Sequence, residues 1–300
     1  MRSHQLRGLH PLPNQDKNAP HWHFRGNFMT DTLSPAWRDR FGGTARLYGS
    51  HALAELAAAH FVVIGLGGVG SWAAEALVRT GAGTLTLIEL DEVCVTNTNR
   101  QLHALTSTLG RSKNQVLAER LRDINPEVSL HCVEDFLDRK NLGELIGKQH
   151  HVVIDATDSA HVKAALVARC LAIKVRLITV GSSGGKSDPR QVVSADLGKT
   201  VADPMLAKVR SHLFRHHNFS RDPGRKFRVD AIYSTEQMVY PKPDGSVCQE
   251  KQVLQSGVKL DCAGGFGSSV MVTGSFGFLA AARAIERYLE HREQAATTVS

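Results

Sequence analysis

The feature that most constrains the fold is a glycine-rich turn placed between an apolar run and a helical run. Residues 61–64 read FVVI, Gly65 to Gly70 read GLGGVG, and SWAAEALVR follows directly. A short apolar run of this kind favours a buried strand, and the glycines allow a tight turn into a helix. This unit therefore predicts the first half of a crossover between parallel strands.

Apolar and helical runs continue to alternate after this unit. Strands are expected at 84–91, 128–133, 150–158 and 175–185, and helices at 113–124, 162–174 and 275–291. Three other segments are less regular: 34–60 reads as an entry segment and a helix, 188–200 as a strand and turn, and 205–236 as basic and partly helical. The alternation predicts an α/β fold, with a doubly wound, Rossmann-like, mostly parallel sheet, helices on both faces, and a C-terminal extension of mixed strand and helix.

One domain is expected over residues 29–291, with a basic insertion at about 205–230. It lies between an aperiodic extension at 1–28 and a short tail at 292–300, both expected to be flexible. The uncharged stretch 262–282 is long enough to cross a bilayer, but its glycines and serines favour a buried strand–turn–helix instead.

Composition narrows the compartment and the partners. The five cysteines are an odd number and form no CxxC motif, which argues against a disulfide framework and against zinc and favours a reducing cytoplasm. The formal net charge of +7 favours anionic partners.

The glycine turn also predicts a nucleotide site. Gly65, Gly67, Gly68 and Gly70 let the backbone approach phosphate groups at the start of a helix, where amide donors are free. Glu89 lies at the end of the next expected strand, 19 positions after Gly70, where its carboxylate can accept hydrogen bonds from ribose hydroxyls. This pattern alone does not separate NAD from ATP.

Polar residues after the later strands favour ATP. Asp91 precedes the run TNTNRQ, in which Asn97 offers a donor and an acceptor and Arg100 can neutralise phosphate charge. Lys113 begins an expected helix, where its ammonium can reach an α-phosphate. Asp158 ends the expected strand HHVVIDATD, and a carboxylate at that edge can hold Mg²⁺.

Taken together, these motifs closely resemble the adenylating enzymes related to ubiquitin activators. The resemblance rests on GLGGVG, the acidic strand end, DEVCVTNTNRQ, the lysine of GRSKNQ, and DATDS. It implies that Gly68 contacts ATP, Glu89 the ribose, Asn97, Arg100 and Lys113 the phosphates, and that Asp158 lies beside Mg²⁺. The family usually has aspartate where this chain has Glu89.

Motifs spread over about residues 34–290 are similar to one branch, the tRNA threonylcarbamoyladenosine dehydratases. They include AWRDRFGGTARLYG, STEQMVYPKPDGSVC and DCAGGFGSSVMVTGSFGF. The resemblance implies ATP-dependent cyclisation of N6-threonylcarbamoyladenosine at position 37 of tRNA, a homodimer, and a partner from a sulfur-relay system.

Three other functions stay open at this stage. An activator of a ubiquitin-like sulfur carrier shares the fold but generally carries the CxxC pairs that are missing here. An NAD-dependent oxidoreductase would leave TNTNRQ and Lys113 unexplained. A non-catalytic nucleotide-sensing scaffold would bind ATP without releasing pyrophosphate.

Four further features have weaker functional interpretations. The family often has an arginine that reaches across a dimer to ATP, where this chain has Gly43; Arg46 is the candidate replacement. Cys248 and Cys262 are candidates for a covalent thioester, although a buried packing role is expected more often, as it is for Cys94. A basic stripe over 210–228 suits RNA phosphates.

Overall fold

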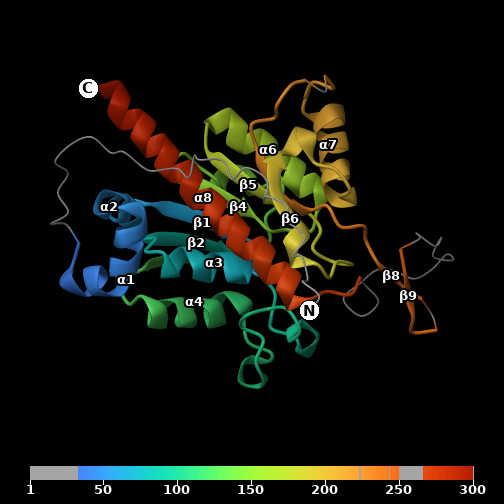
Figure 1. The fold of residues 1–300 in the computed structure, drawn as a ribbon, viewed down its shortest axis with the longest axis horizontal. Coiled ribbons are helices and arrows are strands. Elements are labelled where there is room, and N and C mark those ends of the chain that lie inside the picture. The colour runs from blue at the N-terminus through green and yellow to red at the C-terminus, as the bar shows by residue number, and fades with distance from the viewer. Residues whose placement is uncertain (1–32, 223, 243, 250–265, 300) are drawn as a thin grey trace, which may run out of the picture.

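The computed structural model describes residues 33–222, 224–242, 244–249 and 266–299. A seven-stranded sheet runs through the centre, with helices on both faces (Figure 1). Its strands are β1 (His60–Ile64), β2 (Thr84–Ile88), β3 (Ser129–Val133), β4 (Val152–Asp155), β5 (Arg176–Val180), β6 (Val192–Asp196) and β7 (Asp230–Ser234). Two short strands, β8 (Tyr240–Pro241) and β9 (Val247–Cys248), pair with each other outside this sheet.

The helices come from every part of the described chain. They are α1 (Pro35–Tyr48), α2 (Ser50–Ala58), α3 (Gly70–Arg79), α4 (Lys113–Ile124), α5 (Leu142–Leu145), α6 (Ala160–Ile173), α7 (Pro204–His216) and α8 (Val270–Val299). Single 3₁₀ turns are η2 (Val95–Asn97), η3 (Thr106–Thr108), η4 (Pro189–Gln191) and η5 (Leu197–Lys199).

The strand order β3-β2-β1-β4-β5-β7-β6 reverses direction between β1 and β4. Every neighbouring pair is parallel except β6 with β7. In open α/β sheets the ligand crevice lies at the carboxyl ends of the strands beside such a reversal. The fold is thus the doubly wound, mostly parallel sheet that the sequence predicted, and it places the expected site at the ends of β1 and β4.

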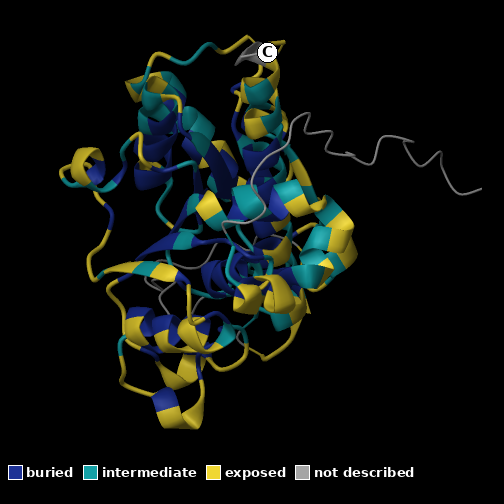
Figure 2. Cartoon of the chain, turned by 90° about the vertical axis from the view of Figure 1, so that its left-hand side faces the viewer, coloured by how far each residue is buried: buried dark blue, intermediate teal, exposed yellow. Residues whose placement is uncertain are grey.

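The sheet has one hydrophobic core on each face. Phe61 and Val63 of β1 pack with α3, α4 and α8, whereas Val62 and Ile64 pack with α6 and α7. Alternate side chains of a strand point to opposite faces, so a strand covered on both sides is apolar throughout. Figure 2 shows the buried residues concentrated along the sheet and on the helix faces turned toward it.

Helix α8 crosses one face of the sheet diagonally and packs closely on α3 (Figure 1). The approach is close at Gly277, where an added Cβ would lie 2.6 Å from the carbonyl oxygen of Val69 and 2.8 Å from the Cβ of Trp72. The Trp72 ring meets Phe278 edge-on at 5.8 Å. Since α3 begins at the glycine turn, α8 supports the back of that turn.

The structure differs from the predicted elements in three places. The segment 34–60 contains two helices, because Ser34 caps α1 through its side chain and Gly49, with φ of 94°, breaks the helix before α2. The expected helix 275–291 is longer and reaches Val299, so most of the expected tail is helical. Strand β7 lies within the segment that was expected to be basic and partly helical.

The described part of the chain contains no helix that is both long and apolar enough to cross a membrane. The uncharged stretch 262–282 forms the start of α8 from Val270 onward. Residues 262–265 of this stretch, which include Cys262, lie outside the described residues, as does the expected extension 1–28.

Candidate nucleotide-binding site

The glycine turn between β1 and α3 needs glycine at two positions for steric reasons. Gly65 has φ of 82°, and an added Cβ would lie 2.9 Å from the carbonyl oxygen of Ala156. An added Cβ at Gly70 would collide with the carbonyl oxygen of Gly65. Because both obstacles are backbone atoms, neither can move aside cheaply. The turn therefore brings its backbone close to the loop after β4, as a phosphate-binding turn requires.

A cavity of about 490 Å³ opens at the carboxyl ends of β1, β2 and β4. Nine of the ten residues predicted for the nucleotide site line it: Gly65, Gly67, Gly68, Glu89, Asp91, Asn97, Arg100, Lys113 and Asp158. Gly70 does not line the cavity; it lies against the Gly65 carbonyl on the other side of the turn. Residues from separate parts of the sequence therefore meet in one cavity.

Glu89 is buried and fastens the glycine turn to the end of β2. Its Oε2 accepts the backbone N–H of Leu66 at 2.9 Å, and its Oε1 accepts the N–H groups of Leu90 and Asp91, each at 3.0 Å. A carboxylate oxygen has two acceptor sites, so Oε2 retains one for a ribose hydroxyl. The extra methylene relative to aspartate lets the carboxylate reach across to Leu66.

Lys113 is the first residue of α4 and is only 5% exposed. Its ammonium donates to Asp91 Oδ2 at 2.8 Å, and its backbone N–H donates to the Asp91 carbonyl at 3.0 Å. A lysine ammonium has three donors, so this ion pair leaves capacity for a phosphate oxygen. Asp91 is half-exposed and holds the ammonium at the cavity wall.

Arg100 and Asn97 come from the loop between β2 and α4. The guanidinium of Arg100 donates to the Thr96 carbonyl at 2.8 Å and to Asn99 Oδ1 at 3.0 Å, both through Nη1. Asn97 is buried, and its Oδ1 accepts the Cys94 N–H at 3.1 Å, which closes the turn η2. An Arg100 Nη1 held this way leaves the other guanidinium donors available for an anion.

His103 lies in the same loop and is 1% exposed. Burial first, and then the charge of Lys113, lower its pKa to about 4. It is therefore neutral near pH 7 and adds no positive charge beside Lys113.

An ion pair that the sequence analysis missed fixes the other wall of the cavity. Asp155 and Lys163 are both fully buried, and Lys163 Nζ lies 3.1 Å from Asp155 Oδ1 and 3.0 Å from its carbonyl oxygen. The Asp155 carboxylate also accepts from Thr157 and Thr179. In the sequence, the pair is visible only as an aspartate at the end of an apolar strand and a lysine eight positions later, in the first turn of an apolar helix. This network positions Ala156 to Asp158, the loop that lines the cavity.

Gln101 is the last residue of the TNTNRQ run, but it was not predicted as a site residue. It lines the cavity, is 8% exposed, and its Oε1 has no hydrogen-bond partner among the described residues. A buried amide oxygen without a donor is unfavourable by about 1–3 kcal/mol, so a bound ligand with an N–H or O–H group would relieve it. The Phe136 side chain, 55% exposed, gives the cavity a flat apolar wall.

The late part of the chain closes over the same edge. Asn99 Nδ2 donates to the Ser268 carbonyl at 3.0 Å, and Gly185 N–H donates to the Gly267 carbonyl at 2.7 Å. An added Cβ at Gly68 would lie 3.2 Å from Arg100 Cγ and 3.3 Å from Thr273 Cγ2, so the start of α8 also contacts the turn.

The weaker candidates do not line this cavity. Arg46 is exposed on α1, and Cys248 is half-buried in β9. Cys94, which was expected to be packed, is exposed because η2 directs it away from the core. In the basic stripe, Arg210 turns inward to Thr200, and Arg221 stacks on Phe214 at 5.4 Å.

Comparison with known proteins agrees with this geometry. Residues 43–299 match the model of the ThiF family, and the chain belongs to that family. The tRNA threonylcarbamoyladenosine dehydratase of Escherichia coli K12 is 49% identical over 261 residues, which cover 87% of this chain and 97% of that protein. The dehydratase of Haemophilus influenzae Rd is 44% identical over 256 residues, which cover 85% of this chain and 95% of that protein.

A solved structure of the Escherichia coli dehydratase in complex with ATP matches with a TM-score of 0.77 and 45% identity, over 87% of this chain and 98% of that chain. The predicted resemblance to the ubiquitin-activator relatives, and to their dehydratase branch, is confirmed by these matches.

Proposed function

We propose that this protein catalyses the ATP-dependent dehydration of N6-threonylcarbamoyladenosine at position 37 of tRNA to its cyclic form. The observation that carries the proposal is the single cavity that gathers the glycine turn, Glu89, Arg100, Lys113 and Asp158. The extent of the similarity to dehydratases, 87% of this chain, favours this substrate over a sulfur-carrier protein.

A free carboxylate reacts poorly with nucleophiles because its leaving group would be oxide, and adenylation replaces that leaving group with AMP. The threonyl carboxylate attacks the α-phosphorus of ATP, the bond to the β-phosphate oxygen breaks, and pyrophosphate leaves. A nucleophilic atom of the same modified group then attacks the acyl carbon, and AMP leaves with the carboxylate oxygen. The net change in the nucleoside is the loss of one water.

The residues of this chain provide binding, alignment and charge for these steps. The main barrier to adenylation is to bring two anions, the carboxylate and the triphosphate, together in line. The glycine-turn amides, Arg100 and Lys113 lower this barrier because they neutralise the phosphates and hold them in place. Glu89 takes the ribose. The apolar wall at Phe136 and Leu137 limits water near the acyl-adenylate, which would otherwise hydrolyse.

Mg²⁺ fits the site as a partner of the phosphates. No group of three or more metal-ligating side chains occurs among the described residues. Magnesium typically takes one or two carboxylates and completes its shell with phosphate oxygens and water. Asp158, exposed at the cavity mouth, would hold it, and the ion would supply charge neutralisation.

The assay that tests the proposal is mass spectrometry of tRNA nucleosides after incubation with ATP and the purified protein. We expect Arg100→Ala and Lys113→Met to lower turnover by about 10²–10³-fold while their melting curves stay cooperative, because they remove charges that meet the phosphates. Arg122→Ala, on the exposed side of α4, is the control and should turn over normally. Normal turnover in both site variants, or no loss of water with the unaltered protein, would refute the assignment.

Three further partner and location predictions belong to this proposal. A homodimer is supported by Met271 and Phe278, which are 64% and 52% exposed and share one face of α8; Arg46 would then act across the interface. Sedimentation tests the oligomer, and loss of ATP affinity in Arg46→Ala tests the arginine. A sulfur-relay partner and a cytoplasmic location stay predictions.

A further inference from the structure

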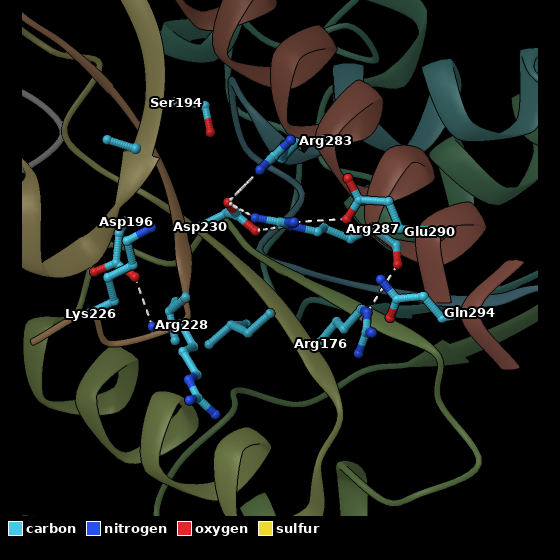
Figure 3. Close-up of a pocket in the computed structure, with 13 residues that line it drawn as sticks. Arg176, Ser194, Asp196, Lys226, Arg228, Asp230, Arg283, Arg287, Glu290 and Gln294 are labelled. Carbon is cyan, nitrogen blue, oxygen red and sulfur yellow. Dashed lines mark hydrogen bonds and ion pairs between the residues drawn. The ribbon is translucent and has the colours of Figure 1, made fainter. Parts of the chain in front are cut away.

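Figure 3 shows a second cavity, of about 660 Å³. It lies at the amino ends of the parallel strands, whereas the nucleotide site lies at their carboxyl ends. It lies where β5 and β7 begin, where β6 ends, and beside the second half of α8. Five cationic side chains line it: Arg176, Lys226, Arg228, Arg283 and Arg287. Three carboxylates line it as well, which leaves two positive charges in excess. We call this cavity the basic pocket.

The carboxylates of the basic pocket are already engaged within the protein. Asp230 accepts from Arg283 at 3.0 Å and from Arg287 at 2.6 Å, and Glu290 accepts from Arg287 at 2.7 Å (Figure 3). The Asp196 carboxylate accepts backbone N–H groups, among them those of Phe227 at 2.9 Å and Arg228 at 2.7 Å. The hydrogen-bonding positions of the three carboxylates are thus largely used within the protein, and the pocket keeps its excess of two positive charges.

Arg176 is one of the cations without a carboxylate. It is half-buried, and its Nε donates to the backbone carbonyl of Arg287 at 2.9 Å. Burial first, and then the charge of Arg287, lower the pKa of Arg176, against the opposing effect of Glu290 and Asp230. A guanidinium partly shielded from water binds an anion more strongly than one on an open surface.

Lys226 and Arg228 are exposed, and neither side chain forms an ion pair with another described residue. Arg228 also has φ of 60°, a left-handed conformation that non-glycine residues rarely adopt. The two hydrogen bonds to Asp196 hold this strained backbone in place. Strain maintained by neighbouring structure often marks a functional position.

We propose that the basic pocket binds a phosphate of an RNA sugar–phosphate backbone, several nucleotides away from the nucleotide that reacts. The proposal rests on the proposed function, since it assumes a tRNA substrate. RNA is favoured over a small free anion because the positive surface extends past the pocket. Arg221 and Arg225 are exposed and lie on the same loop as Lys226 and Arg228.

The distance suits this assignment. Thr273 of α8 contacts the glycine turn, and Arg283 and Arg287 lie ten and fourteen residues further along the same helix. At 1.5 Å per residue, the two sites are separated by about 15–21 Å along α8. At about 3.4 Å per nucleotide along one strand, this corresponds to roughly four to six nucleotides.

The test measures binding of an unmodified tRNA transcript by fluorescence anisotropy at several salt concentrations. The variant is Lys226→Ala with Arg228→Gly, because glycine accepts the left-handed backbone. We expect affinity to fall at least about tenfold at low salt, and the slope of log K against log salt to become shallower by about two contacts. The KM for ATP should stay unchanged.

Arg122→Ala with Lys148→Ala is the matched control, since it removes two exposed positive charges elsewhere. An equal loss of affinity in the control would show a general charge effect and overturn the proposal. A variant that loses stabilisation by inorganic phosphate in a melting assay, but keeps its tRNA affinity, would identify a small-anion site instead.

The two proposals fail in distinguishable ways. If the unaltered protein neither binds tRNA nor removes water from its modified nucleoside, the proposed function fails. If it does both and the variant has the same KM for tRNA, only the basic pocket is wrongly assigned.

Discussion

Loss of the Asp155–Lys163 ion pair should both destabilise the protein and weaken nucleotide binding. Lys163→Met removes the ammonium and keeps a similar volume, so it isolates the charge. Both side chains are fully buried, and Lys163 Nζ makes two contacts of 3.0–3.1 Å with Asp155. Removing one partner of a buried pair typically costs about 3–5 kcal/mol, because the other charge stays buried without compensation. At about 2–4 °C per kcal/mol, Tm should fall by roughly 6–20 °C.

The double variant Asp155→Asn with Lys163→Met is the decisive comparison. An asparagine side chain can keep one hydrogen bond to each of Thr157 and Thr179 without a charge, because its oxygen accepts from one hydroxyl and its amide nitrogen donates to the other. We therefore expect the double variant to recover most of the stability that Lys163→Met loses, which gives a large coupling energy in the mutant cycle. Additive losses would refute the assigned pairing.

The nucleotide readout separates stability from function. The loop from Ala156 to Asp158 directly follows Asp155 of this ion pair and lines the cavity. Isothermal calorimetry at 15 °C, where Lys163→Met stays folded, should show weaker ATP binding. Wild-type affinity in the folded single variant would show that the pair stabilises the fold but does not position the loop.

The remaining predictions concern the glycine turn, its support and acid stability. Gly70→Ala should abolish ATP binding by displacing the Gly65 carbonyl, while Gly67→Ala, whose nearest non-local atom would be 3.8 Å away, should bind within a few-fold of the native protein by calorimetry. Gly277→Ala should lower stability by about 1–3 kcal/mol in denaturant unfolding, whereas Gly274→Ala, with its nearest atoms at 4.0 Å, should not. Burial, and then three neighbouring histidines, lower the pKa of His60 from 6.5 to about 4. The unfolded chain therefore binds a proton that the native state does not, and Tm should fall as pH drops from about 6.5 to 4. His60→Gln should fall less over that range, and a parallel decline in both proteins would contradict this.

Local sequence was sufficient to predict many elements. Helix α4 begins at Lys113 and ends at Ile124, as expected, because Ser112 caps it and the Asn125-Pro126 pair ends it. Strands β1, β4 and β5 were recognisable because strands buried on both faces are apolar throughout. Strand β7 was missed because it directly follows a basic loop and begins with the charged Asp230, so it was read as part of the basic segment.

Some residues of the candidate site were also recognisable from local sequence, and others were not. Glycines, acidic strand ends and the TNTNRQ run are local patterns, so Gly65, Glu89 and Arg100 could be selected from the sequence alone. The Asp155–Lys163 pair could not, because a lysine on an otherwise apolar helix resembles any surface lysine until its burial is known. The same holds for the partnerless Gln101 Oε1.

The sequence by itself determined the class of fold, the nucleotide turn and the residues offered to it, because each depends on patterns within a few positions of the chain. Tertiary structure decided which charges are neutralised and where the basic stripe lies. Arg176 and Arg287 are 111 positions apart in sequence, yet they share the basic pocket at the amino ends of the parallel strands. Burial and ion pairing depend on packing between distant segments, and no local pattern encodes them.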